Sequence, residues 1–471
     1  MNMAFIIVVL LLVGYLLIGT SHITRVNRAA IAMFVCTLGW VMYISYGTDF
    51  VMSQHARGFL DFLSGELPNS NNVKYYIYDD IFLNHVGKAA AVLLFLLSTM
   101  SIIEILNNNG CFDFISEWIR TRNSKRLLWT ITIATFVISA NLDNLTTTVM
   151  MLVIMRNVVQ NRKQRMLIGS AVVLAANTGG SFTVIGDPAS VVMWGNGAVT
   201  ATNFSAYLFL PAVTAWVVFT YLIGRSLPDR LDLEWHMAPY RGDDTNLNRW
   251  QRIVMLLVGI GGLWFIPTFH NITKLSPFVG ALCVLSILWV VNEVFNRKLY
   301  GADQMTTGNR MPAALQYGTI QQMLFVLAVM LGIGVVYETG IFSLLAEYVD
   351  YQMHNVWGFG LIVGVLSGII DTFAIAVTSI YMYPVMDGNL NQWADADYLS
   401  CFMQNGIFWK IIAYSTGVGG CFFCFANVGG LALMKMERMK VSWYLKHCTW
   451  KVCVGWLLGY LVLFLEYFIM R

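Results

Sequence analysis

Aspartate residues interrupt three of the most apolar stretches of this sequence. Asp143 lies within ISANLDNLTTT, Asp187 within SFTVIGDPAS and Asp371 within VLSGIIDTFAIAVT. At the centre of a membrane-spanning helix a carboxylate costs about 2.5 to 3.5 kcal/mol, so each one needs a compensating proton, cation or hydrogen-bond donor. Burial favours the protonated carboxyl group and a bound cation favours the carboxylate, so proton and cation compete for the same oxygens. That competition is the chemistry of cation/proton exchange.

Further oxygen-bearing side chains lie next to these aspartates or at matching places later in the chain. Hydroxyl, amide and carbonyl oxygens are the ligands that hard cations prefer. A threonine hydroxyl can instead bond to a carbonyl of its own helix. The sequence predicts a Na⁺ site at Asp143 and Asp371. The other candidates for binding a cation or proton are Asn144, Thr146, Thr147, Asp187, Thr372, Ser415, Thr416 and Asn427.

Two glutamates, Glu104 and Glu338, lie at the ends of apolar stretches in corresponding parts of the two halves of the chain. They are candidates for a proton relay, with an interfacial charge as the alternative interpretation of each. The predicted transported ions are Na⁺ or Li⁺ and H⁺. No resident cofactor is predicted.

The composition places these side chains in a membrane protein. Hydrophobic residues make up 57% of the 471 residues and charged residues only 12%, which leaves too little polar surface to cover a water-soluble globule. The apolar stretches approach the roughly 20 residues that a membrane-spanning helix needs. A net charge of +3 without a basic tail gives no reason to expect a nucleic-acid partner. The eight cysteines and seven histidines do not cluster as metal ligands do.

Basic residues flank the Asp143 segment on both sides, at 120–126 and again from Arg156. Because lysine and arginine in short loops mark the cytoplasm, both ends of the segment should face it. The polar break around Asp143 leaves arms of roughly 14 and 8 residues, about 21 and 12 Å long, and neither spans a core of about 30 Å. The sequence therefore predicts a re-entrant hairpin over 127–155 with its tip near the middle of the membrane.

Residues 166–197 are long enough to cross the membrane, but glycines and the Asp187-Pro188 pair interrupt them. They predict a broken helix, a feature of ion sites in secondary transporters. A second copy follows: Asp371 matches Asp143, and Asn427 takes the place of Asp187. This copy predicts a hairpin over 357–386 and a broken helix over 408–434. The candidate backbone hinges are Gly179, Gly180, Gly186, Gly419 and Gly420.

No lysine or arginine occurs between Met311 and Trp409, so the second hairpin is predicted to enter from outside. The expected fold is an all-α polytopic membrane protein with two inverted repeats and about ten full spans. The predicted parts are a first repeat (1–230), a cytoplasmic loop (231–251) and a second repeat (252–471). Both termini are then predicted to lie outside.

Several stretches resemble NhaD-type sodium/proton antiporters of the ion transporter superfamily, almost from end to end. They include VISANLDNLTTTVM, AANTGGSFTVIGDPASVVMW, IAYSTGVGG and KMERMKVSWYLK. The resemblance implies a bacterial cytoplasmic-membrane protein that forms a homodimer through its scaffold helices. It also implies a cation site with a contribution from the two glutamates Glu104 and Glu338. The implied site residues are Asp143, Asn144, Asp187 and Asp371.

The second half departs from the pattern of that family. The usual D-N-x-P tip is replaced by Asp371-Thr372-Phe373-Ala374, and the usual Gly-Ser of the second broken helix by Ala426-Asn427. In the first broken helix, Ala189 replaces a threonine.

Three other functions remain open from the sequence. One is a sodium-coupled symporter of carboxylates or other anions on the same scaffold, although three aspartates at the site would repel an anion. Another is an intramembrane aspartyl protease using Asp143 and Asp187, which would require G-x-G-D where this chain has VIGD. The third is a passive channel.

Overall fold

The computed structural model describes residues 2–65, 67–115, 119, 121, 123–230, 247–297, 317–386, 388 and 395–470. These residues form helices, turns and two isolated β-bridges. The helices of the first half are α1 (Asn2–Gly19), α2 (Ser21–Thr24), α3 (Arg28–Ser45), α4 (Gly47–Gln54), α5 (Ala56–Leu63), α6 (Ser70–Tyr76), η1 (Ile77–Phe82), α7 (Leu83–Asn108), α9 (Ser124–Ser139), α10 (Asn144–Val158), α11 (Arg162–Ser181), α12 (Pro188–Gly195) and α13 (Ala201–Gly224).

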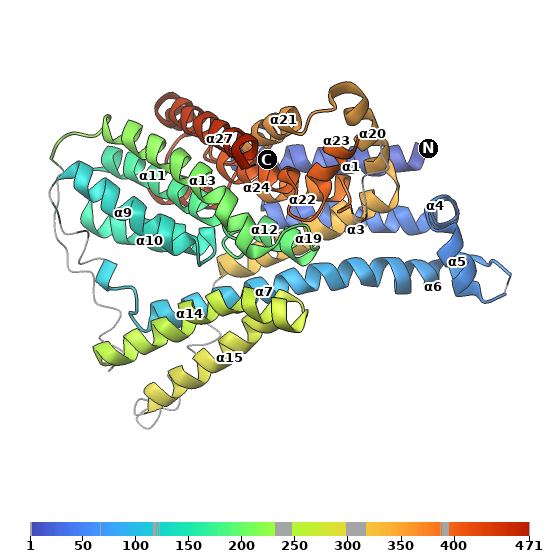
Figure 1. Cartoon of the computed structure of the whole chain (residues 1–471), viewed down its shortest axis with the longest axis horizontal. Helices are drawn as coiled ribbons and strands as arrows, with labels where there is room; N and C mark the ends of the chain where they lie inside the picture. The colour runs from blue at the N-terminus through green and yellow to red at the C-terminus, as the bar shows by residue number, and fades with distance from the viewer. Residues whose placement is uncertain are drawn as a thin grey trace.

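The helices of the second half are α14 (Arg249–Thr273), α15 (Pro277–Phe295), α19 (Tyr317–Glu338), α20 (Ile341–Met353), α21 (Val356–Ile369), α22 (Thr372–Met382), α23 (Ala396–Leu399), η4 (Ser400–Phe402), α24 (Ile407–Gly419), α25 (Val428–Glu437), α26 (Val441–Tyr444), η5 (Leu445–Thr449) and α27 (Trp450–Met470). Figure 1 shows these helices packed along the long axis of the molecule.

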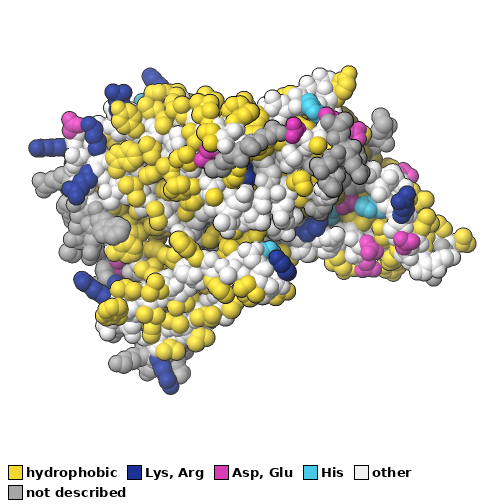
Figure 2. Space-filling view, in the orientation of Figure 1, with side chains coloured by type: hydrophobic (Ala, Val, Ile, Leu, Met, Phe, Trp, Pro, Cys, Tyr) yellow, Lys and Arg dark blue, Asp and Glu magenta, His cyan; other side chains and the backbone are white. Residues whose placement is uncertain are grey.

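Seven helical segments of the described chain are long and apolar enough to cross a membrane. With the shorter apolar helix α1 and the two broken helices, they account for the ten predicted spans. Many large apolar side chains remain exposed, among them Phe34, Leu257 and Trp264, each more than 60% exposed. Such a surface suits lipid contact rather than water. Figure 2 shows it as broad yellow areas, with most of the Lys and Arg toward the left end and most of the Asp and Glu toward the right.

Both predicted hairpins are present as helix-turn-helix pairs. Helices α9 and α10 meet at a short turn over 140–143, and α21 and α22 meet at 370–371. A polar residue that can cap a helix follows each apolar arm, so the chain stops one helix and starts another there. In Figure 1, α9 and α10 lie on the left and α21 and α22 lie near the middle of the molecule.

Both predicted broken helices are present too. The first consists of α11 and α12, separated by residues 182–187, and the second of α24 and α25, separated by residues 420–427. The two halves of the chain interlock here, because α10 packs on α25, α12 packs on α22 and α11 packs on α24. The all-helical fold expected from the sequence is thus confirmed. The domain boundaries stay a prediction, and residues 231–246 of the predicted cytoplasmic loop lie outside the described residues.

Glycine is required where the hairpin arm α9 crosses the broken helix. A Cβ on Gly179 of α11 would clash with the Phe136 carbonyl oxygen of α9. The new methyl group would be fixed to the backbone of α11, and the atom that it meets belongs to the backbone of α9, so neither can shift without moving a helix. We therefore expect Gly179→Ala to destabilise the protein by about 1 to 3 kcal/mol. Thermal unfolding of the purified protein in detergent measures this effect. Gly195→Ala is the control because Gly195 has open space around it. Equal melting temperatures for the two variants would contradict the prediction.

Candidate functional site

Four short helices begin at the four polar residues that the sequence singles out. Asp143 caps α10, Asp187 caps α12, Asp371 caps α22 and Asn427 caps α25, each accepting a backbone N–H of its own helix. The partial positive charge of a helix N-terminus stabilises a carboxylate placed there. Capping uses only part of each side chain, so the remaining oxygens decide what the site can do.

Asp143 is 2% exposed, and only one of its carboxylate oxygens is satisfied. Its Oδ2 accepts hydrogen bonds from the Thr146 backbone N–H at 3.0 Å and from the Thr146 hydroxyl at 3.2 Å. Its Oδ1 is buried without a hydrogen-bond partner among the described residues. The Gln322 side chain of α19 lies close enough to interact with this carboxylate. A buried carboxylate oxygen without a donor is an open position for a proton or a cation.

Asp187 connects the first break to the first hairpin tip. Its Oδ1 accepts the Ala189 N–H at 2.8 Å, and its Oδ2 lies 3.2 Å from the Asn144 amide nitrogen. Asn144 also contacts the Asn177 side-chain oxygen at 3.4 Å. Asp187 lies within electrostatic range of both Asp143 and Asp371. The three aspartates that the sequence predicts at one site are therefore brought together.

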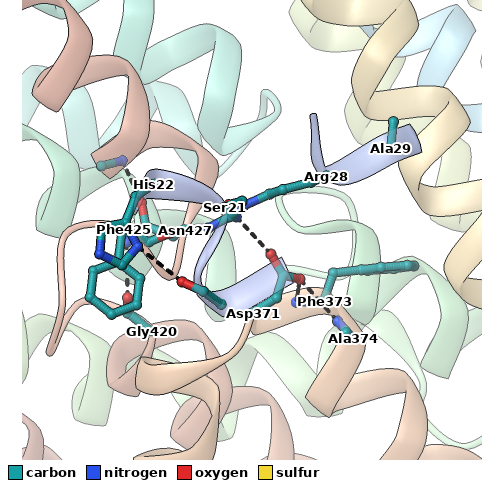
Figure 3. A network of polar contacts seen from close by, with 12 residues as sticks. Ser21, His22, Arg28, Ala29, Asp371, Phe373, Ala374, Gly420, Phe425 and Asn427 are labelled. Atoms are coloured by element: carbon teal, nitrogen blue, oxygen red, sulfur yellow. Dashed lines mark hydrogen bonds and ion pairs between the residues drawn. The ribbon is translucent and has the colours of Figure 1, made fainter. Parts of the chain in front are cut away.

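Asp371 has a partner that the sequence analysis missed, the guanidinium group of Arg28 (Figure 3). Arg28 Nη1 lies 3.0 Å from Asp371 Oδ2, while Asp371 Oδ1 accepts the N–H groups of Phe373 at 3.0 Å and Ala374 at 3.1 Å. The side chains are buried, at 10% exposure for Arg28 and 1% for Asp371. Arg28 is the first residue of α3, and its side chain reaches the tip of the second hairpin.

The two halves of the site thus differ in charge balance. The second-half carboxylate, Asp371, is paired with a cationic side chain. For Asp143 and Asp187, the contacts seen in the described chain are with amide, hydroxyl and backbone N–H groups, none of which carries a positive charge. Within the described part of the chain, the first half therefore holds two carboxylates without a fixed counterion.

The predicted hydroxyl ligands fall into two groups. Thr147 and Ser415 have buried hydroxyl groups with no hydrogen-bond partner in the described part of the chain. Thr416 instead donates to the Ile412 carbonyl of its own helix at 2.8 Å. Thr372 packs its methyl group where a Cβ on Gly420 would be. Thr147 and Ser415 thus have buried hydroxyls without a partner in the described chain, whereas the Thr416 hydroxyl is bonded to its own helix.

Asn427 is buried and directed inward at the second break. Its side-chain oxygen accepts the Gly430 N–H at 2.6 Å, and its amide donates to the Gly420 carbonyl at 3.0 Å. The remaining predicted hinge glycines lie where backbones meet: Gly180 touches Gly186, and Gly419 touches Gly364. A close-packing role is therefore established for these glycines, and their role as hinges stays a prediction.

Glu338, the last residue of α19, is held by two histidines. His55 Nε2 lies 2.5 Å from its Oε2, and His85 Nε2 lies 2.6 Å from its Oε1. Glu338 follows Gln322 by sixteen residues on the same helix, about 24 Å at the rise of an α-helix. It therefore lies far from the Asp143 carboxylate along this helix. The other relay candidate, Glu104, lies near the end of α7.

The pairing of His55 with Glu338 predicts a pH-dependent stability. The hydrogen bond to Glu338 raises the pKa of His55 above its usual value of about 6.5. A raised folded-state pKa contributes stability that is fully present below the unfolded pKa and is lost as pH rises through the folded pKa. We expect the melting temperature to fall as pH rises from the unfolded pKa of His55 through its folded pKa. The fall should be smaller in Glu338→Gln than in the wild type. Exposed Glu347→Gln serves as control. An unaltered pH profile in Glu338→Gln would contradict this.

A cavity of about 350 Å³ lies beside the later part of α12. Its lining includes Asn84 and Lys88 of α7, Asn196 after α12 and Phe278 of α15. None of the predicted site residues lines it. Among the described residues, no group of three or more His, Cys, Asp or Glu side chains is placed to hold a metal ion. A monovalent cation would therefore depend on amide, hydroxyl and carbonyl oxygens beside a carboxylate.

Comparison with known protein families identifies the family to which this protein belongs. The model of a citrate transporter family, CitMHS, matches residues 3–399. The chain belongs to this citrate transporter family. It is similar to sodium/proton antiporter 2 of Arabidopsis thaliana, with 30% identity over 79% of this chain and 84% of the relative. It is also similar to the Na⁺/H⁺ antiporter NhaD of Vibrio parahaemolyticus, with 26% identity over 79% of this chain and 88% of the relative.

The predicted resemblance to NhaD-type antiporters is confirmed by these relatives. The family and the relatives are named as transporters and antiporters, so this protein is a membrane transporter. The protease alternative is therefore set aside. A solved structure of the YdaH transporter of Alcanivorax borkumensis shares the fold. Its TM-score is 0.55 at 14% identity, over 94% of this chain and 99% of the other.

Sequence reasoning missed those partners of the site residues that lie hundreds of positions away in the sequence. Arg28 and Asp371 are 343 residues apart, and His85 and Glu338 are 253 apart. Gln322 sits within an apolar stretch and carries no motif. One available signal for Arg28 was its position immediately before an uninterrupted apolar helix, where a charge needs a partner.

Proposed function

We propose that this protein exchanges Na⁺ or Li⁺ for H⁺ across the cytoplasmic membrane of a bacterium. The transported ions bind at the carboxylates where the two hairpin tips meet the two broken helices. The observation that carries this proposal is the buried Oδ1 of Asp143, which has no hydrogen-bond partner among the described residues. The antiporter names of the relatives support the same conclusion.

The proposed cation ligands are Asp143, Asp187 and the Asn144 side chain, with Thr147 as an available hydroxyl. The Ser415 hydroxyl instead faces Gly360 of α21. A proton on Asp143 neutralises the buried charge in the absence of the cation, and the cation neutralises it when bound. An unneutralised carboxylate is costly at this depth. The protein therefore switches between inward-open and outward-open conformations only when Asp143 holds either a proton or the cation. Asp371, which the sequence predicts as the second cation ligand, forms an ion pair with Arg28 in this conformation.

Orientation and assembly belong to the same proposal. Lys and Arg gather toward one end of the molecule in Figure 2, which by the positive-inside rule faces the cytoplasm. Both termini then lie outside, and two copies associate through the scaffold helices. The proposed alternation moves the hairpins and broken helices between inward and outward access.

Transport in inverted vesicles containing a pH-reporting dye tests the proposal. Adding Na⁺ or Li⁺ to vesicles acidified inside should release protons, and K⁺ serves as the comparison ion. Vesicles without the protein are the control. If neither Na⁺ nor Li⁺ moves protons, the antiporter proposal fails.

The second candidate is a sodium-coupled carboxylate symporter. The family description names citrate transport, and the N-termini of four short helices converge at the site, which is a feature of anion sites. At each of these N-termini, however, a side chain of the protein itself accepts backbone N–H groups. Uptake of radiolabelled citrate driven by Na⁺, without proton release on Na⁺ addition, would replace antiport by symport.

A further inference from the structure

The guanidinium group of Arg28 is surrounded by oxygen acceptors from three separate parts of the chain (Figure 3). Nη1 lies 3.0 Å from Asp371 Oδ2, Nε donates to the Ser21 hydroxyl at 3.0 Å, and Nη2 donates to the Phe425 carbonyl. His22 stacks on the Phe425 ring, with centroids 4.1 Å apart. The connection between α1 and α3 is thereby fixed against both the second hairpin tip and the second break.

These acceptors are a carboxylate, a backbone carbonyl and a hydroxyl. The same oxygen types form binding sites for hard cations in proteins. Carbonyl oxygens of unwound helix segments are the usual cation ligands in transporters with broken helices. The Arg28 guanidinium therefore lies where the second half of the chain offers cation ligands.

The first half offers an equivalent arrangement without an arginine. Asp143 matches Asp371, and the break over 182–187 matches the break over 420–427. The Asp143 Oδ1 that corresponds to the paired oxygen of Asp371 has no partner among the described residues. The Asp143 half-site thus faces neutral groups among the described residues, the Gln322 side chain included, whereas the Asp371 half-site is filled by a cationic side chain.

We propose that Arg28 is a resident cation that occupies the second half-site and limits the protein to one transported cation per chain. The inference rests on the proposed function. An arginine stays protonated at all physiological pH values, so Asp371 can neither release a proton to it nor accept Na⁺ while the pair is intact. Arg28 is accordingly a specificity-determining residue for ion stoichiometry.

Equilibrium binding of radioactive Na⁺ to the purified full-length protein at alkaline pH tests this inference. The wild type should bind one Na⁺ per chain. Arg28→Met leaves Asp371 unpaired, and the number of sites should double to two. Adding Asp371→Asn to Arg28→Met should return it to one. Arg28→Lys, which keeps a cation, and Arg25→Gln, which changes an exposed arginine of the same connection, should both stay at one.

A further variant separates this inference from the proposed function. Arg28→Met combined with Asp143→Asn should retain one site, at Asp371. Two sites in the wild type would overturn the inference, and so would one site in Arg28→Met with the Asp143 site intact. If Arg28→Met does not fold, Arg28→Gln takes its place: two sites support the inference and one site overturns it. Failure of the wild type to bind either Na⁺ or Li⁺ would instead overturn the proposed function.

Discussion

Replacing Asp143 with asparagine should abolish Na⁺-driven proton release. A unit charge pair about 4 Å apart is worth about 4 kcal/mol at an effective dielectric constant near 20, so Na⁺ affinity should fall by about a thousandfold. Asparagine also cannot carry the exchanged proton. The measurement is dye-reported proton movement in inverted vesicles over a range of Na⁺ concentrations.

Asparagine is the informative replacement because it keeps the helix cap. It has nearly the shape of aspartate and still accepts the Thr146 N–H at the start of α10. A loss of exchange with an unchanged melting temperature therefore reports the missing charge. Asp49→Asn, an exposed change on α4, is the matched control. Normal exchange by Asp143→Asn would remove this residue from the proposed cation site.

Replacing Asp371 with asparagine should destabilise the protein strongly. Asparagine still caps α22, but the Arg28 charge remains buried without its carboxylate. Breaking a buried ion pair in this way costs about 3 to 5 kcal/mol, because one charge is left uncompensated. The measurement is thermal unfolding of the purified protein in detergent.

A double-mutant cycle separates the pair from the individual side chains. Arg28→Met combined with Asp371→Asn removes both charges and should recover most of the lost stability. Asp229→Asn is the matched control, because it breaks the exposed Lys125–Asp229 pair and should cost less than about 1 kcal/mol. Equal losses for Asp371→Asn and Asp229→Asn would show that the buried pair contributes little.

The sequence located the elements of the site because their signals are local. An apolar arm, a polar break and a capping side chain stand within a few residues of one another at 140–148 and again at 368–374. Glycines placed next to a second capping residue marked both broken helices. The structure starts α10, α12, α22 and α25 at those capping residues, since helix ends depend mainly on the nearby chain.

The charge balance of the site was not available from the sequence. Only the packing of the α1–α3 connection against the second hairpin brings Arg28 to Asp371. The relay role of Glu338 stays a prediction, and only the fold brings His55 and His85 to its carboxylate.

The sequence by itself determined that this protein is a helical membrane transporter with aspartates at two hairpins and breaks. Hydropathy and helix capping act over short stretches of chain, so a linear reading captures them. Only the tertiary structure decided which of those aspartates has a counterion. The reason is physical: pairing two buried charges depends on distances of a few ångströms between residues hundreds of positions apart, and these exist only once the helices have packed.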